Sequence, residues 1–324
     1  MNLSTTKPFI LQSETVRGCG EDSAFVHNYE SGLVVTGVFD GCGEIGSRKY
    51  SGANDRTGAY IGSRIAACAA SEFFEQEYSK KGVSYIKRTS AEQLECVRQL
   101  KEHITGKLTE VKEKLSKSEM ESGISLPTAV SITATMSAGK FTLCNCVWAG
   151  NSRSYMIDDQ GLCQLTVDDT DVDSGDAFLD MRKKSRITNF AGGNVSFLLR
   201  SGFTVLARPS ILVNASADCF SHFRTPMDFE NVVLETMAEA QSPSRWMARL
   251  GEKMKKVSGG DFTMTIACYG FEDFDDMKKY YSMRLIRLQN DYINMQAGAD
   301  GKILKQLWDK YKSVYYRNPL KREY

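Results

Sequence analysis

The feature that most constrains this chain is the segment 33–43, LVVTGVFDGCG, in which an apolar, β-branched run ends abruptly at Asp40-Gly41. A buried run of Val, Leu and Phe is typical of an interior strand, and glycine tolerates the backbone geometry of a sharp exit. The segment therefore predicts a buried strand that holds the carboxylate of Asp40 at its rim.

Three further acidic sites stand beside similar apolar runs. Glu21-Asp22 precedes SAFVHN, Asp218 follows ILVNASA, and Asp261 precedes FTMTIACYG. Each alone would be read as a turn or capping residue. Together they supply the oxygen ligands that Mg²⁺ and Mn²⁺ prefer at fixed octahedral positions. The set therefore predicts a site for divalent cations.

Five motifs in this order resemble the PP2C-like (PPM) family of metal-dependent protein serine/threonine phosphatases, from about Arg17 to Phe271. RGCGED matches the family's Arg followed by Glu-Asp, and VFDGCG matches its Asp-Gly-His-Gly strand end. VWAGNSRSYMIDDQG matches a Gly-Asp-Ser-Arg hairpin, ILVNASADCF a strand ending in Ser-Asp-Gly, and GGDFTMTIACY the Asp-Asn before the last strand. One Asp-Gly pair is common in turns, whereas five motifs in family order carry the resemblance.

Periodicity along the chain predicts an α+β protein. Helical spacing occurs over 57–78, 90–116 and 229–257, and strand-like segments occur at 23–29, at 33–39, within 124–167 and after Asp261. Strands in runs with helical pairs between them favour a layered sandwich over βαβ alternation. Residues 124–167 are expected to form a hairpin sequence in one of two stacked sheets. The resemblance implies a four-layer α-β-β-α sandwich, with two antiparallel sheets flanked by helices.

The last part of the chain lies outside the resemblance. We interpret residues 1–271 as a PP2C-like domain and residues 272–324 as a C-terminal helical extension, with two amphipathic helices separated by 298–301. Its aromatic side chains could dock on a protein partner or a second copy, although such a stripe more often packs on its own domain. These aromatic residues are Tyr280, Tyr281, Trp308, Tyr311, Tyr315 and Tyr316.

Composition excludes several classes of function. The chain has 324 residues, 42% of them hydrophobic, and can bury a substantial core. Its 41 basic and 40 acidic residues leave a net charge of +1, so composition predicts neither nucleic-acid nor membrane partners.

The N-terminus lacks a charged leader with a long apolar core, and we expect a cytoplasmic location. Nine scattered cysteines predict small buried side chains in a reducing compartment, with Cys144 and Cys146 on one strand face.

The resemblance implies a hydrolytic site with two Mn²⁺ or Mg²⁺ ions. Asp40 would bridge the ions, and the carbonyl oxygen of Gly41 would be an additional ligand. Paired cations lower the pKa of a bridging water, and the hydroxide would attack phosphorus in line. The remaining predicted ligands are Asp218 and Asp261 on one ion, and Glu21 and Asp22 on the other, partly through water.

Arg17 is the predicted phosphate clamp and, with Asp40, a predicted catalytic residue. A guanidinium can form two parallel hydrogen bonds to phosphoryl oxygens and offset their charge. An isolated Arg before a strand would usually be a solvated surface residue. The four-residue offset between Arg17 and Glu21, however, matches the family motif.

Four positions depart from the family pattern. Cys42 stands where many members have a His that protonates the leaving alkoxide, and a thiol is a poorer acid for that task. Asn151 stands where members have an Asp that helps to bind a third metal, so we expect a third site to be weak or absent. Cys219 replaces a Gly, and Phe262 replaces an Asn.

Three functions are compatible with these patterns. The first is hydrolysis of phosphoserine and phosphothreonine on proteins by a metal-activated water. The second is a catalytically weak or inactive PP2C-like module that binds a protein partner, through the C-terminal helices for example. The third is a metal-dependent nuclease, which the balanced charge disfavours. The retained carboxylates favour the enzyme, because a pseudoenzyme has no physical need for several mutually repelling charges.

Overall fold

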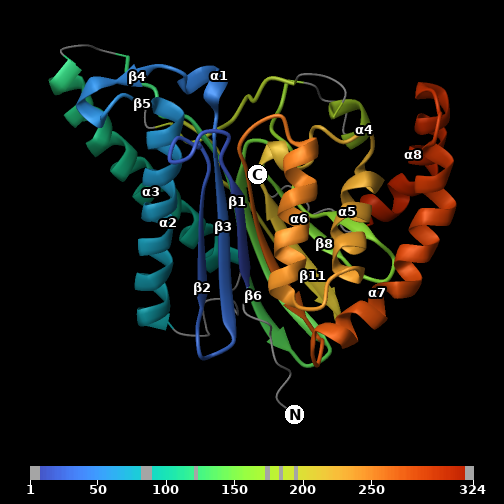
Figure 1. Ribbon diagram of the computed structural model, residues 1–324. Coiled ribbons are helices and arrows are strands. Elements are labelled where there is room, and N and C mark those ends of the chain that lie inside the picture. The colour runs from blue at the N-terminus through green and yellow to red at the C-terminus, as the bar shows by residue number, and fades with distance from the viewer. Residues whose placement is uncertain are drawn as a thin grey trace.

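The computed structural model describes residues 8–81, 90–119, 123–171, 176–181, 185–192 and 196–317. Two five-stranded antiparallel sheets pack face to face, and helices cover the outer face of each sheet (Figure 1). The four-layer α-β-β-α sandwich predicted from the sequence is therefore confirmed.

The first sheet carries the strand that ends in Asp40. Its strands in spatial order are β10 (Arg200–Ala207), β7 (Phe141–Ala149), β6 (Thr128–Ala138), β3 (Leu33–Gly41) and β2 (Ser23–Asn28). Helices α2 (Gly58–Lys81) and α3 (Ser90–Glu119) cover its outer face (Figure 1). Small buried residues of α2, such as Ala66 and Ala70, let the helix lie close to β3. Because β3 is central and paired on both sides, the position of its end is fixed.

The second sheet is covered by the C-terminal half of the chain. Its strands in spatial order are β1 (Phe9–Ser13), β12 (Phe262–Tyr269), β11 (Ser210–Ala215), β8 (Arg153–Ile157) and β9 (Leu162–Gln164). The helices on this side are α5 (Pro226–Ala238), α6 (Pro243–Val257), α7 (Phe274–Leu288) and α8 (Gly301–Tyr315). The predicted helical region 229–257 is two helices because Ser242 caps a new helix and Pro243 starts it.

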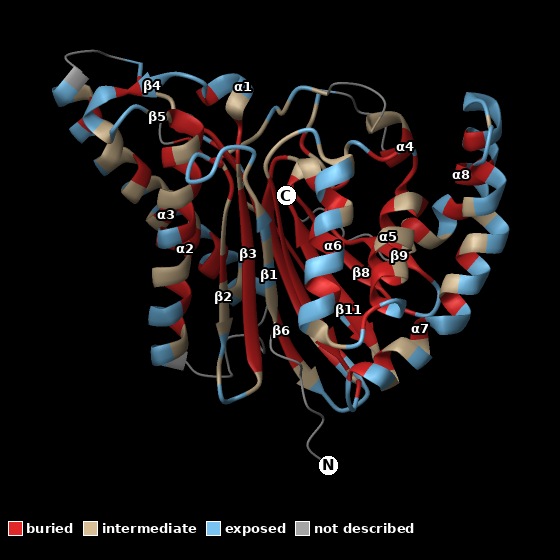
Figure 2. Cartoon of the chain, viewed as in Figure 1, coloured by how far each residue is buried: buried red, intermediate tan, exposed pale blue. Residues whose placement is uncertain are grey.

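Short elements complete the fold around one end of the sandwich and between the last two helices. They are α1 (Gly43–Gly46), β4 (Lys49–Tyr50), η1 (Ser51–Ala53), β5 (Arg56–Thr57), α4 (Ala177–Asp180), η3 (Ala217–Cys219), η4 (Gln289–Ile293) and η5 (Asn294–Gln296). Burial is concentrated in the two sheets and in the helix faces that pack against them (Figure 2).

The space between the sheets contains both apolar and polar side chains. Trp148, Met156 and Tyr269 are buried there together with Cys144 and Cys146, whose sulfur atoms lie 3.7 Å apart. The two cysteines therefore share a strand face as predicted. Seven of the nine cysteines are buried, which agrees with their predicted role as small core residues.

The prediction that residues 124–167 form a hairpin sequence within one sheet is wrong. Strands β6 and β7 belong to the first sheet, whereas β8 and β9 belong to the second. The chain crosses between sheets after Gly150, which has φ +92°, and a Cβ atom there would lie 2.6 Å from that of Ala129. Only glycine allows this positive φ and close approach without strain. Asn151 therefore lies at a crossover between the sheets.

The C-terminal helices pack on their own domain. Tyr281, Trp308, Tyr311 and Tyr315 are buried in the same apolar cluster as strand residues of the second sheet. The aromatic stripe of the extension is therefore already covered, and the domain boundary at Phe271 stays a prediction. Among the described helices, none is both long and apolar enough to cross a membrane.

Candidate active site

A pocket of about 1100 Å³ opens at the end of the sandwich. Antiparallel pairing of Ser23 with Phe39 places the residue before β2 beside the end of β3. Pairing of Ala215 with Met264 likewise places the end of β11 beside the start of β12. All six predicted metal ligands line this pocket: Glu21, Asp22, Asp40, Gly41, Asp218 and Asp261.

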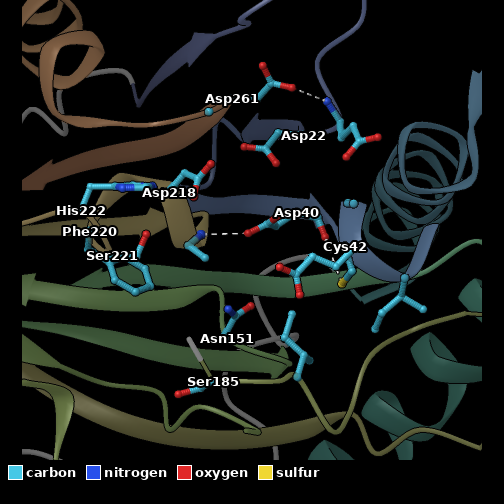
Figure 3. A pocket seen from close by; sticks show the side chains of 18 of the residues that line it. Asp22, Asp40, Cys42, Asn151, Ser185, Asp218, Phe220, Ser221, His222 and Asp261 are labelled. Atoms are coloured by element: carbon cyan, nitrogen blue, oxygen red, sulfur yellow. Dashed lines mark hydrogen bonds and ion pairs between the residues drawn. The ribbon is translucent and has the colours of Figure 1, made fainter. Parts of the chain in front are cut away.

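Asp22, which is buried, and Asp40, which is partly buried, lie at the centre of the pocket. Burial and then the negative charge of Asp40 raise the pKa of Asp22 well above its usual value. Burial also raises the pKa of Asp40 to about 6, opposed by a hydrogen bond that its Oδ2 accepts from the Ala217 amide at 2.8 Å and assisted by the charge of Asp218. Figure 3 shows the side chains of Asp22, Asp40 and Asp218 around one space. The site concentrates negative charge where water is partly excluded.

Glu21 and Asp261 lie at the outer side of the pocket and are held by neighbouring groups. Thr57 donates its hydroxyl to Glu21 Oε1 at 2.5 Å. Asp261 accepts hydrogen bonds from the amides of Glu21 at 3.0 Å and Thr15 at 2.6 Å. Burial raises the pKa of Glu21, and the charge of Asp261 adds to the shift. A Cβ atom at Gly43, the first residue of α1, would lie 2.4 Å from Glu21 Oε2, so a side chain there would displace the Glu21 carboxylate.

The donor set fits hard divalent cations. Oδ2 of Asp22 is buried and has no hydrogen-bond partner among the described atoms. A buried carboxylate oxygen without a partner is costly unless the group is protonated or a cation neutralises it. Carboxylate and carbonyl oxygens are the ligands that Mg²⁺ and Mn²⁺ prefer. As they stand, however, no three Asp, Glu, His or Cys side chains in the described ranges are grouped as a ready-made metal cluster.

The residues that depart from the family pattern also lie at the pocket. Cys42 lines it, and burial, followed by the charge of Asp40, raises the pKa of its thiol. Asn151 lines it too, with a buried Oδ1 that has no hydrogen-bond partner among the described atoms. Cys219 and Phe262 are buried and pack in the core of the second sheet. Cys42 and Asn151 therefore line the pocket, whereas Cys219 and Phe262 do not.

Arg17 does not reach the pocket in this structure. It is exposed and is not among the residues that line the cavity. Its assignment as the phosphate clamp therefore stays a prediction.

Sequence reasoning missed three other basic side chains at the pocket. Arg186 lines it and is exposed. His222 lies 3.3 Å from Asp218, four residues earlier in the chain, a spacing that could have indicated the contact. Arg153 is buried and pairs with Asp168 at 2.7 Å. No pattern in the sequence distinguishes Arg186 from other surface arginines.

Solved structures of bacterial serine/threonine phosphatases have the same fold. Serine/threonine phosphatase Stp1 from Staphylococcus aureus is 13% identical, with a TM-score of 0.56, and the match covers 83% of this chain and 98% of that chain. The phosphatase PstP/Ppp of Mycobacterium tuberculosis is 18% identical, with a TM-score of 0.53, and covers 82% and 99%. The catalytic domain of PstP in complex with two manganese ions is 16% identical, with a TM-score of 0.50, and covers 82% and 98%.

No protein-family model matches the chain, and a sequence comparison with curated proteins finds no match. The structural likeness at 13 to 18% identity therefore establishes the fold, which is that of the PP2C-type serine/threonine phosphatases. The roles of individual residues at the pocket stay predictions.

Proposed function

We propose that this protein is a metal-dependent phosphatase that hydrolyses phosphoserine and phosphothreonine on proteins. One observation carries the proposal: six oxygen ligands from four separate segments line one pocket, in a fold shared with serine/threonine phosphatases. Such a convergence is unexpected for turn residues that act separately. Phosphorylated proteins are thus the proposed partners, and the cytoplasm is the proposed location.

The residues of the pocket would hold two Mn²⁺ or Mg²⁺ ions. Asp40 and the carbonyl oxygen of Gly41 lie at the rim of a strand fixed on both sides, which suits a shared ligand position. When bound, the ions lower the pKa of water and so supply a nucleophile near neutral pH. The proposed outer ligands, divided as the resemblance implies, are Asp218 and Asp261 for one ion and Glu21 and Asp22 for the other.

Two arginines are candidates for the contact with the phosphoryl group. Arg17 has the spacing of the family motif, and Arg186 lines the pocket. Either guanidinium can donate two parallel hydrogen bonds to phosphoryl oxygens. Replacing each in turn by Lys, which keeps the charge but not the fork, separates the candidates by the change in KM.

The test is hydrolysis of para-nitrophenyl phosphate and of a phosphothreonine peptide, with Mn²⁺ and with EDTA. We expect turnover of both substrates with Mn²⁺ and none with EDTA. The matched control is Asp40→Asn, which keeps the shape of the side chain but removes its charge. Turnover that EDTA does not affect would refute metal dependence.

The same experiment separates the enzyme from the partner-binding module. If the wild-type protein binds the phosphopeptide but releases no phosphate at any Mn²⁺ concentration, the protein is the inactive module. Cys42 and Asn151, which stand at the pocket where the family pattern has His and Asp, favour this second function. A thiol is a poorer acid than an imidazolium, and an amide binds a cation more weakly than a carboxylate does.

A further inference from the structure

Part of the pocket lining comes from the end of a short helix that cannot be stable alone. Helix α4 is a single turn, and Asp180 at its end and Met181 after it line the pocket. The first turn of a helix fixes several residues for one hydrogen bond, so an isolated turn is unfavourable in water. Contacts with other elements must therefore hold α4 in place.

Helix α8 supplies those contacts. The amide of Ala177, the first residue of α4, donates a hydrogen bond to the hydroxyl of Tyr316 at 2.6 Å. The ring of Phe178 stacks on that of Trp308 with 6.4 Å between centroids, and both side chains are buried. The next two amides of α4 donate to Asp176, which is its N-cap. All three leading amides of α4 therefore have side-chain acceptors, one of them from the end of α8.

The same end of α8 contacts a second part of the pocket. The hydroxyl of Tyr315 accepts a hydrogen bond from Arg153 Nη1 at 3.2 Å and donates one to Gln164 at 2.7 Å. Arg153 lines the pocket and is also held by Asp168, another lining residue. Tyr315 is fully buried, so water does not compete for these hydrogen bonds. Tyr315, the last residue of α8, and Tyr316, its C-cap, thus hold two separate stretches of the pocket.

We propose that α8 is a positioning element of the active site, with Tyr316 and Trp308 orienting α4 and Tyr315 orienting Arg153. This inference rests on the proposed phosphatase function and assigns a role to the C-terminal extension, which the resemblance does not cover. The tyrosines do not touch the reacting atoms. They set the shape of the wall on which the polypeptide part of a substrate lies.

A positioning role predicts a specific kinetic signature. A peptide substrate extends beyond its phosphoryl group and contacts the wall, whereas para-nitrophenyl phosphate is small enough to reach the carboxylates without it. Loosening α4 therefore raises KM for the phosphopeptide more than it lowers kcat. KM for para-nitrophenyl phosphate changes by less than about twofold.

The test compares Tyr316→Phe with Tyr311→Phe. Both variants remove one tyrosine hydroxyl: Tyr311 lies within α8, and Tyr316 is its C-cap. The hydroxyl of Tyr311 contacts Glu230, Arg284 and the Leu162 amide, none of which lines the pocket. Hydrogen exchange over 176–181 is measured together with the kinetics of both substrates. For Tyr316→Phe we expect exchange to become about two- to tenfold faster, the range for loss of one net hydrogen bond, with a similar rise in phosphopeptide KM. Tyr311→Phe is expected to leave both values at the wild-type level.

The proposal would be overturned if Tyr316→Phe left either the hydrogen-exchange rate of 176–181 or the phosphopeptide KM at its wild-type value. Equal changes in Tyr311→Phe would also overturn it, since they would indicate general loosening of α8. If the wild-type protein shows no turnover, the proposed function fails by itself. Hydrogen exchange and phosphopeptide Kd then decide the positioning role, with the same expected changes and the same refuting results.

Discussion

The buried ion pair that joins α5 to α7 gives a sharp test of how the C-terminal helices are held. Arg284 donates two hydrogen bonds to Glu230, Nε to Oε1 at 2.6 Å and Nη2 to Oε2 at 2.8 Å. Glu230 is fully buried. In Glu230→Gln the side-chain NH₂ group faces an N–H donor of Arg284. The Arg284 guanidinium is then buried without a counter-charge. Breaking such a pair costs about 3–5 kcal/mol.

The matched control is Glu239→Gln, which breaks the exposed pair of Glu239 with Arg249 at 3.1 Å. Exposed pairs contribute at most about 1 kcal/mol. For a chain of this length the unfolding entropy is roughly 0.7 kcal/mol per kelvin, so we expect Tm to fall by about 4–7 °C in Glu230→Gln and by under about 2 °C in the control. Thermal unfolding followed by circular dichroism gives both values.

A double variant separates charge burial from packing. Glu230→Leu combined with Arg284→Met removes both charges and fills similar volume, so its free energy of unfolding should return to within about 2 kcal/mol of the wild type. If Glu230→Gln lowers Tm no more than the surface control does, the pair does not anchor the helices and the reasoning is refuted.

Three further predictions concern the pocket. Asp40→Asn should lower kcat/KM on the order of 100-fold or more and weaken Mn²⁺ binding measured by calorimetry, because a shared ligand loses its charge; wild-type turnover would sink the assignment. Cys42→His should raise phosphopeptide turnover, by up to ~100-fold, more than para-nitrophenyl phosphate turnover, because a serine alkoxide needs protonation more than an activated phenolate does; equal effects on both would remove the acid role. Asn151→Asp should increase Mn²⁺ stoichiometry in a titration and raise the rate at high Mn²⁺, because a carboxylate binds the ion more strongly than an amide; unchanged stoichiometry and rate would leave Asn151 as a turn residue.

The sequence patterns predicted neither β1 nor β10, because such segments carry too little information. Strand β1 is half-exposed at one sheet edge, and β10 forms an edge of the other sheet with Phe203 and Val205 exposed. Edge strands bury only part of their surface, so their composition is less constrained than that of β3 or β12. Central strands, buried on both faces, are easily recognised for the same reason.

The layered fold and the acidic residues at the pocket could be predicted from the sequence alone. Apolar runs that end in carboxylates constrain both, since burial fixes the strand and the turn fixes its last residue. The packing of the layers determines that the chain changes sheets after Gly150, that Arg17 is exposed and does not line the pocket, and that the end of α8 contacts α4 and Arg153. These features depend on contacts between segments far apart in the sequence, such as the pairing of Arg153 with Ala215, or on the direction of a flexible side chain. Local composition and periodicity do not encode either, because each such contact forms only when the packed layers bring its two partners together.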